Sequence, residues 1–373
     1  MKEIDGSTLE GGGQILRNAV AFAALSRTPI KISNIRKGRR PPGLKAQHAA
    51  GVNLIGQISK GSTLVGAVKD SQTLEFFPGE LQAGEYSADP GTAGATTLLL
   101  QVSLPTLLFS NSPEPEISIL RLKGGTNAIQ APQIDYTERI FLPFIKKHFD
   151  IDVKLDISCR GYYPKGGGQI QVTVSTRSTP LPSFTLLERG AVTAVRGRAY
   201  VAGLPPRLAK DCRDAARALL VKKGVEPSII EIEYLRESPS DAFGAGSGIL
   251  LWAETEHGCI LGGSAIGKKG SDAADLGREA AEELISNLAH GGVVDEYLQD
   301  QWIIFGALAK GKSRLRCGPL TLHTRTAMWL AEQLTDARFK EIPDEDGSTV
   351  IIECDGIGYT APQRVDTMES DEA

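Results

Sequence analysis

Apolar positions along the chain follow two periods, and the order in which the periods occur repeats. Short alternating runs predict strands, and longer runs with apolar residues three or four positions apart predict helices. After a strand-like start at 2–5, the first unit has helix, strand, helix and two strands at 15–25, 30–32, 43–58, 63–65 and 73–76. The same order follows at 96–108, 116–122, 134–149, 153–155 and 169–174. The pattern predicts an α/β fold built from repeated βαβαββ modules.

A short sequence repeat supports this duplication. Residues 11–15 are GGGQI, and the same five letters return at 166–170. Further glycine-rich turns occur at 90–94 and 124–126. A repeated pentapeptide is thin evidence alone, so the prediction depends mainly on the order of strands and helices.

A proline-rich stretch at 179–183 interrupts the pattern and indicates a domain boundary. Residues 184–277 have strands at 191–201 and 229–235 and a helix at 207–222, so we expect a smaller inserted α/β domain there. The large domain, built from the repeated modules, would be discontinuous, comprising 1–183 and 278–360. Its last module would contain helices at 280–288, 294–308 and 325–334 and strands at 313–316 and 349–353. The acidic tail, 361–373, is expected to be disordered.

Composition narrows the class of protein. With 41% hydrophobic and 23% charged residues among 373, the chain can bury a sizeable core. Five scattered cysteines without a CxxC pair argue against a zinc ribbon and a disulfide framework. Neither a signal sequence nor a membrane-spanning apolar run is evident, so we expect a soluble intracellular protein without membrane contact. A net charge of −4 means that any RNA contact requires a local basic patch.

Three glycines precede the first predicted helix, in the run EGGGQILR at 10–17. Free backbone N–H groups and the helix dipole favour an anion such as phosphate at this position. Glu10, Gln14 and Arg17 can face one place, because Arg17 lies about one turn beyond Gln14. Structural glycines in a tight turn would explain the same run equally well.

A basic loop follows at 36–44, where four cations are set among glycine and proline residues. Arginine can bind a phosphate through two hydrogen bonds, which lysine cannot do. A solvated run of charge is the alternative. The glycines and prolines fix the shape of the loop and favour the phosphate-binding interpretation.

Two motifs near the end of the chain contain further candidates. His323 lies at the expected start of a helix, where a neutral imidazole could attack phosphorus, although a single histidine is more often structural. Tyr297, with Asp300 one turn later, could hold a purine or could simply form a partly buried helix face. Residues 262–269 nearly match a P-loop, but Lys269 replaces the metal-binding serine or threonine, so we reject that match.

Taken together, these motifs resemble the RNA 3′-terminal phosphate cyclase family, in its histidine-containing branch. The resemblance extends from Ile4 to about Glu353. It rests on 10–17, PGL at 42–44, the GTAG turn at 91–94 with Gln101 on the next helix, Ala131 and Pro132, EYLxDQ at 296–301 and LHT at 322–324. It implies three βαβαββ modules in a large domain, with a smaller α/β domain inserted before the last module.

The resemblance also implies a mechanism and residue roles. His323 would attack the α-phosphorus of ATP to form a histidine-AMP intermediate, AMP would pass to an RNA 3′-phosphate, and the 2′-OH would close a 2′,3′-cyclic phosphate. Glu10 would hold Mg²⁺ or Mn²⁺. Phosphates of ATP or of the RNA end would be bound by Gln14, Arg17, Arg36 and Arg39. The nucleotide would be held by Gln101, Pro132, Tyr297, Asp300 and Gln301.

Two alternatives remain open. A non-cyclase branch of the family acts in ribosomal RNA processing and lacks the nucleophilic histidine; His323 within LHT, with Glu10 and Gln101 retained, argues against it. An enolpyruvyl transferase shares related modules but would not explain His323 together with Glu10. Since eukaryotic relatives are nuclear, we expect the nucleus rather than the cytoplasm.

Overall fold

The computed structural model describes residues 1–111, 117–345 and 347–361. Its first sheet has the order β1-β2-β5-β4, with β1 parallel to β2 and the other neighbours antiparallel. The strands are β1 (Lys2–Asp5), β2 (Ile30–Ser33), β4 (Thr63–Val65) and β5 (Leu74–Phe77). Helices α1 (Gly13–Ser26) and α2 (Ala46–Ile58) follow β1 and β2. A two-stranded ladder of β3 (Ser59–Lys60) and β6 (Glu80–Leu81) lies beside them.

The second module repeats this topology. Its sheet has the order β7-β8-β10-β9, again with one parallel pair followed by two antiparallel pairs. The strands are β7 (Glu85–Ala88), β8 (Ile117–Gly124), β9 (Val153–Gly161) and β10 (Gly168–Ser175). Helix α3 (Thr96–Leu108) follows β7. The helix expected at 134–149 consists of α4 (Ile134–Tyr136), a π-helical turn (Thr137–Phe141) and α5 (Leu142–Phe149).

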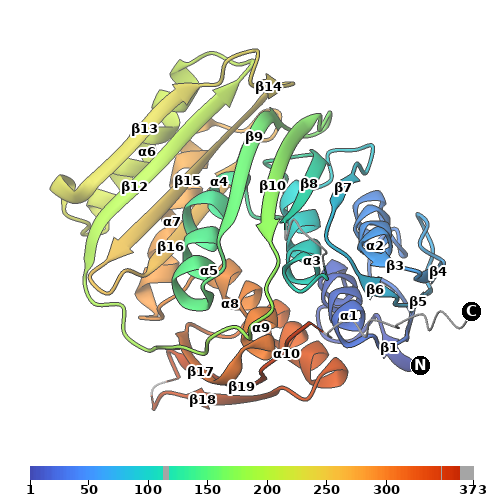
Figure 1. Cartoon of the computed structure of the whole chain (residues 1–373). Helices are drawn as coiled ribbons and strands as arrows, with labels where there is room; N and C mark the ends of the chain where they lie inside the picture. Colours follow the sequence, from blue (N-terminus) through green and yellow to red (C-terminus); the bar gives the residue numbers. More distant parts are fainter. Residues whose placement is uncertain (112–116, 346, 362–373) are drawn as a thin grey trace, which may run out of the picture.

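The third module has the same order once more, β11-β17-β19-β18. Its strands are β11 (Thr185–Leu186), β17 (Lys310–Cys317), β18 (Arg338–Pro343) and β19 (Val350–Ile357). Its helices are α8 (Glu296–Gln301), α9 (Ile303–Leu308) and α10 (Leu322–Leu334). Among the residues that the structure describes, the βαβαββ topology therefore occurs three times, which confirms the predicted α/β architecture (Figure 1).

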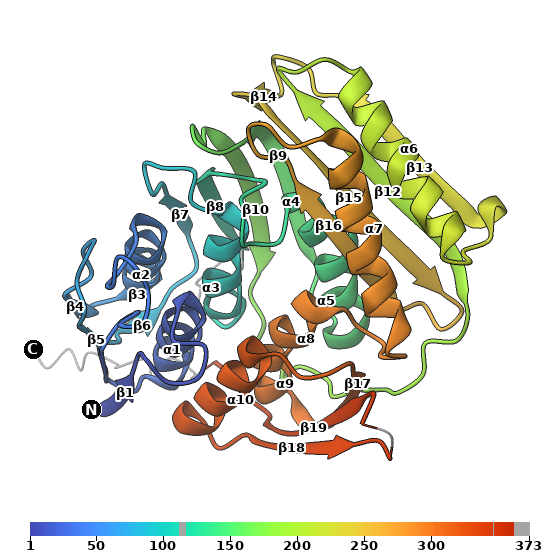
Figure 2. The same ribbon diagram turned by 180° about the vertical axis from the view of Figure 1, so that it is seen from behind.

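A separate four-stranded sheet, β13-β12-β15-β16, lies at the opposite end of the molecule from β18 (Figure 1). It is formed by β12 (Val192–Ala202), β13 (Ile230–Arg236), β15 (Gly246–Thr255) and β16 (Ile260–Ile266). Helices α6 (Arg207–Lys222) and α7 (Ala273–Ala289) pack against each other and against this sheet (Figure 2). Their apolar faces share one buried cluster with the strands, so this unit has its own core. A short strand from it, β14 (Ala242–Phe243), joins the second sheet beside β9.

The structure moves both ends of the predicted insert, 184–277. Strand β11 lies within that range, yet it pairs with β17 and completes the third sheet. The boundary between 277 and 278 falls inside α7, whose buried residues Leu276, Ala280 and Leu284 belong to the insert's core. The insertion therefore lies inside the third module, after its first strand, rather than before the module.

Other differences from the prediction are local. Helix α2 begins at Ala46 rather than at 43, because Gly43 has φ +82° and cannot belong to a helix. Trp302 separates α8 from α9 within the helix expected at 294–308. Residues 260–266 form β16, in agreement with the rejection of a P-loop there. The first residue of the strand expected at 116–122 and nearly all of the acidic tail lie outside the described residues.

Helix α1 is the centre of the large domain. Ile15, Phe22 and Leu25 are buried, and the helix packs against α2 of its own module, α3 of the second and α10 of the third. An apolar surface on several sides predicts such a central position. The helix ends where Arg27 takes the left-handed conformation and its N–H returns to Ala23 and Ala24 carbonyls.

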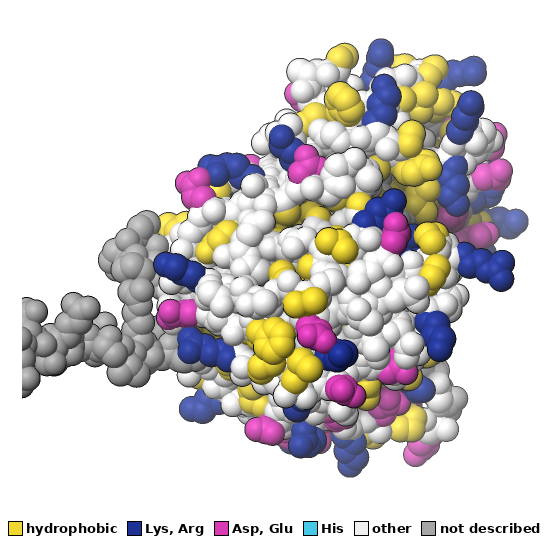
Figure 3. Space-filling view, turned by 90° about the vertical axis from the view of Figure 1, so that its right-hand side faces the viewer, with side chains coloured by type: hydrophobic (Ala, Val, Ile, Leu, Met, Phe, Trp, Pro, Cys, Tyr) yellow, Lys and Arg dark blue, Asp and Glu magenta, His cyan; other side chains and the backbone are white. Residues whose placement is uncertain are grey.

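Surface charge is mixed. On the face in Figure 3, lysine and arginine side chains are interspersed with aspartate and glutamate side chains. No helix within the described residues is long and apolar enough to cross a membrane. Because the two signs of charge are mixed on this face, we expect a polyanion to bind at a local cluster of basic residues.

Candidate active site

A cavity of about 620 Å³ lies where the three modules meet. The first turns of α1, α2, α8 and α10 contribute to its lining, together with α3 and the segment that precedes α4. Helix N-termini offer free N–H groups and partial positive charge, so their convergence favours an anion. Every site residue predicted from the sequence lines this cavity: Glu10, Gln14, Arg17, Arg36, Arg39, Gln101, Pro132, Tyr297, Asp300, Gln301 and His323.

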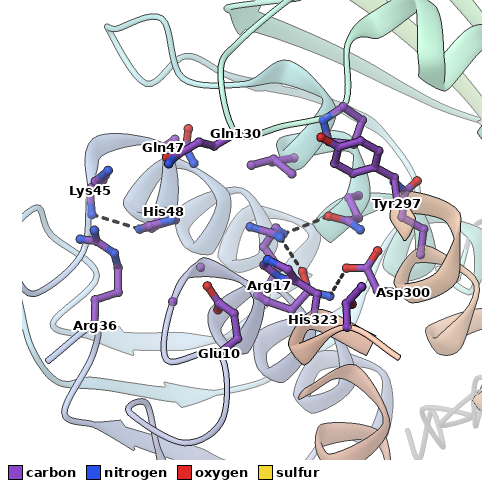
Figure 4. Close-up of a pocket in the computed structure, with 18 of the residues that line it drawn as sticks. Glu10, Arg17, Arg36, Lys45, Gln47, His48, Gln130, Tyr297, Asp300 and His323 are labelled. Atoms are coloured by element: carbon purple, nitrogen blue, oxygen red, sulfur yellow. Dashed lines mark hydrogen bonds between the residues drawn. The ribbon is translucent and has the colours of Figure 1, made fainter. Parts of the chain in front are cut away.

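Four polar residues from three modules form a chain of hydrogen bonds at one side of the cavity (Figure 4). The Arg17 guanidinium donates to Gln101 Oε1 (3.0 Å) and to Gln14 Oε1 (2.5 Å). Gln14 Nε2 in turn donates to Asp300 Oδ2 (2.8 Å). These bonds tie α1 to α3 and α8, so the residues of different modules orient one another.

The charges in this chain shift one another's ionisation. Burial raises the pKa of Asp300 to about 7, although the positive charge of Arg17 opposes the shift. Burial likewise lowers the pKa of the Arg17 guanidinium, with Asp300 and Glu10 acting in the opposite direction. Perturbed carboxyl groups at a polar cavity are typical of functional sites.

The Glu10 carboxylate is held at the mouth of the glycine-rich turn. Its Oε1 forms an ion pair with Arg39 Nη2 (2.9 Å), while Oε2 is buried and has no hydrogen-bond partner. A Cβ atom on Gly12 would lie 2.1 Å from Oε1, so the glycine lets the carboxylate occupy this position. A buried carboxylate oxygen without a partner is suited to a cation.

The described residues contain no cluster of three or more His, Cys, Asp or Glu side chains that could enclose a metal ion. Glu10 alone is compatible with Mg²⁺, which keeps several waters and is commonly held by one or two carboxylates plus substrate phosphates. Glu10 thus fits an ion that arrives with a phosphate ligand.

The two predicted phosphate-binding arginines of the basic loop have different surroundings. The Arg39 side chain is half exposed and reaches Glu10. Arg36 is buried, and its Nη1 donates to the carbonyl groups of Pro41 (3.1 Å) and Gly43 (2.8 Å). Burial lowers the pKa of Arg36, with the charge of Arg39 acting in the same direction. Arg36 therefore fixes the shape of the loop while it borders the cavity.

His323 lies in the first turn of α10, which begins at Leu322, three residues before the predicted start at 325. The Thr321 hydroxyl caps this helix by accepting from the Thr324 N–H (3.1 Å). Gln299 on α8 accepts from both residues and so fixes the start of α10. The imidazole is exposed to the cavity, and partial desolvation lowers its pKa while Glu10 opposes the shift. At neutral pH the imidazole is therefore mainly neutral and can act as a nucleophile.

Tyr297 and Pro132 both line the cavity, from α8 and from the segment that precedes α4. Tyr297 projects from α8 and packs edge-on against Tyr136, with ring centroids 5.6 Å apart. The Pro132 carbonyl accepts from the Thr97 hydroxyl of α3 (2.9 Å). Figure 4 shows Tyr297 and Asp300 on one side, Lys45 and His48 on the other, and His323 and Glu10 below them.

Several lining residues were not among the predicted site residues. Lys45, Gln47 and His48 at the start of α2 border the cavity, as do Gln130 and Thr321. Burial lowers the pKa of His48 to about 3, aided by nearby cations, and its Nδ1 accepts from the Lys45 N–H (3.2 Å). For Lys45, Gln47 and His48 the available signal was their place directly after the basic loop, at the N-terminal end of a helix.

Comparisons with known proteins identify the family of the chain. The profile of the RNA 3′-terminal phosphate cyclase family matches residues 8–341. The chain belongs to this family. A cyclase relative from Drosophila melanogaster, named RNA 3′-terminal phosphate cyclase, is 39% identical over 360 residues, which cover 96% of this chain and 97% of the relative.

Two further cyclase relatives come from distant organisms. One from Dictyostelium discoideum, named a probable RNA 3′-terminal phosphate cyclase, is 39% identical and covers 96% of this chain and 83% of its own length. Another from Pyrobaculum neutrophilum, named RNA 3′-terminal phosphate cyclase, is 37% identical, with coverage of 95% and 99%. Membership of the cyclase family confirms the resemblance inferred from the motifs.

Proposed function

We propose that this chain is an ATP-dependent RNA 3′-terminal phosphate cyclase that works through a covalent histidine-AMP intermediate. The observation that carries the proposal is that His323, the unpartnered oxygen of Glu10 and the Arg17 guanidinium border one cavity. A nucleophile, a cation ligand and a phosphate-binding cation are the parts that nucleotidyl transfer requires. The names of the relatives support RNA as the substrate.

In the first step, a ring nitrogen of neutral His323 attacks the α-phosphorus of ATP. An N–P bond forms, the bond to the bridging oxygen of pyrophosphate breaks, and pyrophosphate leaves. The lowered pKa of His323 keeps its lone pair available, and the N-terminus of α10 stabilises charge on the phosphorus oxygens.

In the second step, an oxygen of the RNA 3′-phosphate attacks the same phosphorus and releases His323. The resulting phosphoanhydride makes AMP a good leaving group. The adjacent 2′-OH then attacks the phosphorus of the RNA 3′-phosphate and gives its proton to solvent. The bond from that phosphorus to the bridging oxygen breaks, and AMP leaves as the 2′,3′-cyclic phosphate closes. Arg17 and Arg39 are placed to bind phosphate oxygens during these steps.

Glu10 would hold Mg²⁺ or Mn²⁺ through its unpartnered carboxylate oxygen, Oε2. The metal would supply neutralisation of charge on the phosphates. The nucleotide would lie between Tyr297 and Pro132, with polar contacts from Gln101, Asp300 and Gln301. An intracellular, nuclear location stays a prediction.

The test is to incubate the chain with α-labelled ATP and Mg²⁺, then measure acid-labile label on the protein. We expect label on the wild type, its release as labelled RNA-bound AMP and then free AMP on addition of RNA with a 3′-phosphate, and a loss of at least about 1,000-fold in His323→Ala. His257→Ala, which removes an exposed histidine of the insert, should label normally.

An unlabelled wild-type chain that nevertheless binds ATP would contradict the proposal. That result would favour the non-catalytic branch of the family, whose members act in ribosomal RNA processing.

A further inference from the structure

The insert is hydrogen-bonded to two walls of the cavity. One wall is the segment 126–133, called here the pocket loop, which presents Gln130 and Pro132 to the cavity. The other wall is α8, which presents Tyr297 and Asp300. We propose that the insert positions the nucleotide site, by holding the pocket loop and α8 at a fixed separation. This inference rests on the proposed function, because it assumes that the cavity takes ATP.

The pocket loop is bound to the insert through Gln133 and Asn127, both about 1% exposed. Gln133 Nε2 donates to the Ile249 carbonyl of β15 (3.1 Å) and to the Ala265 carbonyl of β16 (3.3 Å). The Tyr200 hydroxyl of β12 donates to Gln133 Oε1 (2.8 Å) and accepts from Asn127 Nδ2 (2.9 Å). The residue next to Pro132 is thus bonded to three strands of the insert.

A buried group of charges continues this contact beyond the pocket loop. Arg160 of β9 forms a two-pronged bond with Asp135 (both 2.8 Å), and Arg198 of the insert donates to the same carboxylate (3.0 Å). Glu237 of the insert binds both arginines. Burial raises the pKa of Asp135, but the two arginines outweigh it and lower the pKa overall. An ion group in which each charge has a partner defines one arrangement of the two domains.

The second wall is anchored on β16 as well. The Gly262 N–H donates to Asp295 Oδ2 (2.7 Å), and the other oxygen of Asp295 accepts from the Tyr136 hydroxyl (2.6 Å). Asp295 also caps α8, because its Oδ1 accepts from the N–H groups of Tyr297 and Leu298. A Cβ atom on Gly262 would lie 2.7 Å from Ile140 Cδ1, so glycine permits this close approach.

Strand β16 therefore binds both walls, at Ala265 for the pocket loop and at Gly262 for α8. An interface that only joined the two domains would need no contact with Gln133, next to Pro132, or with Asp295, which caps the helix that carries Tyr297. Removing one partner of such a buried hydrogen bond costs the most free energy when no water can reach the group that is left.

The decisive variant is Tyr200→Phe, which removes one hydroxyl and keeps the ring. We would measure the dissociation constant for ATP by calorimetry, in the His323→Ala background to prevent covalent transfer. We expect a rise of about tenfold, as for the loss of one buried hydrogen bond. The affinity for a 3′-phosphorylated RNA oligonucleotide should stay within about twofold, and the melting temperature within a few degrees.

The matched control is Tyr234→Phe, in the same domain but with an exposed side chain. It should leave ATP affinity unchanged. Hydrogen exchange of residues 126–133 should accelerate in Tyr200→Phe and not in Tyr234→Phe. Arg198→Lys, which keeps the charge but loses the two-partner geometry, provides a second variant if Tyr200→Phe does not fold, and it should weaken ATP binding as well.

The outcomes separate the two claims. Unchanged ATP affinity in a folded Tyr200→Phe chain, or in Arg198→Lys if that variant is needed, would overturn the inference and leave the proposed function intact. An absence of ATP binding in the His323→Ala chain and in the wild type would contradict the proposed function, and the inference with it.

Discussion

Asp300 shows how a single site residue is held in an unfavourable environment. Protein surrounds its carboxyl on every side except the cavity, and burial raises its pKa to about 7. In the unfolded chain the same group ionises near its ordinary value of 3.8. Ionisation therefore favours the unfolded chain, and this residue lowers the free energy of unfolding as pH rises from about 4 to about 7.

We expect Asp300→Asn to stabilise the nucleotide-free protein. The gain in the free energy of unfolding should be larger at pH 8 than at pH 5, by on the order of 1–2 kcal/mol, since the cavity side of the residue is open to water. Urea denaturation at the two pH values would measure it. Asp211→Asn, at an exposed position on α6, should show no such difference. A gain that is equal at both pH values would contradict the explanation.

The same substitution should weaken ATP binding, because Asp300 is one of the polar groups of the proposed nucleotide site. Stability and function would then change in opposite directions at this residue, as is common where a site contains a buried charge.

Glu10→Gln tests the proposed metal ligand. The amide keeps the shape of the side chain but loses the charge, so we expect adenylylation to fall by about 100-fold or more, equivalent to about 3 kcal/mol. The remaining activity should depend less steeply on Mg²⁺ concentration, measured as initial rate of labelling. Glu3→Gln, at an exposed position on β1, is the control. Unaltered Mg²⁺ dependence in Glu10→Gln would exclude Glu10 as the ligand.

For single residues, the sequence predicted which ones lie around the cavity, but not which groups each one contacts. The motifs and the family resemblance named eleven residues that all line the cavity, but they missed Lys45, Gln47, His48, Gln130 and Thr321. They did not indicate that Arg36 bonds to its own loop, or that His48 would be buried beside Arg17 and Arg36. Those facts depend on packing between segments that are distant along the chain.

The start of α1 is the element most constrained by its sequence. Gly11 has φ +61°, and Cβ atoms on Gly12 and Gly13 would approach the Glu10 carboxylate and His48 Nε2 at 2.1 and 2.6 Å. The glycines of this turn therefore leave space for the side chains of Glu10 and His48, in addition to offering N–H groups to an anion.

We expect Gly12→Ala to reduce adenylylation at least about tenfold while the fold persists, because the added methyl group displaces the Glu10 carboxylate. Gly38→Ala is a matched control in the neighbouring basic loop, since a Cβ atom there would meet nothing within 4 Å. Rates of labelling and melting curves for both variants would check this. Equal rates in the two variants would show that the carboxylate position is unimportant.

Helix bounds were predicted well where amphipathic periodicity is strong, as in α6 at 207–222, and where a long apolar run forms a buried helix, as in α3 at 96–108. The prediction was wrong where a capping side chain sets the start of a helix or where pairing with a distant strand defines a short strand. Thr321 caps α10 and extends it to include His323. Strand β11 has only two residues, so no pattern in its own sequence distinguishes it.

For the whole molecule, the charge distribution sets how RNA can bind. The net charge is −4, while Arg39, Arg40 and Lys45 line the cavity. RNA attraction should therefore be confined to a few phosphates at the 3′ end. We expect log K for a 3′-phosphorylated oligonucleotide to fall against log salt with a slope of about −2, as for about three phosphates of a single strand.

Fluorescence anisotropy between low and physiological salt would measure this slope. Lengthening the oligonucleotide beyond the last few nucleotides should not steepen it. A slope that grows steadily with length would indicate an extended RNA-binding surface instead.

The repeated architecture was predictable from the order of elements, whereas the place of the insertion was not. The insert separates β11 from its partner strand β17, and the hydrogen bond from the Phe184 N–H to Ser313 spans 129 residues. During synthesis from the N-terminus, the first two modules can close as soon as they emerge, because all of their main strands are local. The third sheet has to wait, with its edge strand already made, until an entire second domain has left the ribosome. The cavity, which needs α8 and α10, is thus completed last, so an unfinished chain would hold folded modules and no assembled site.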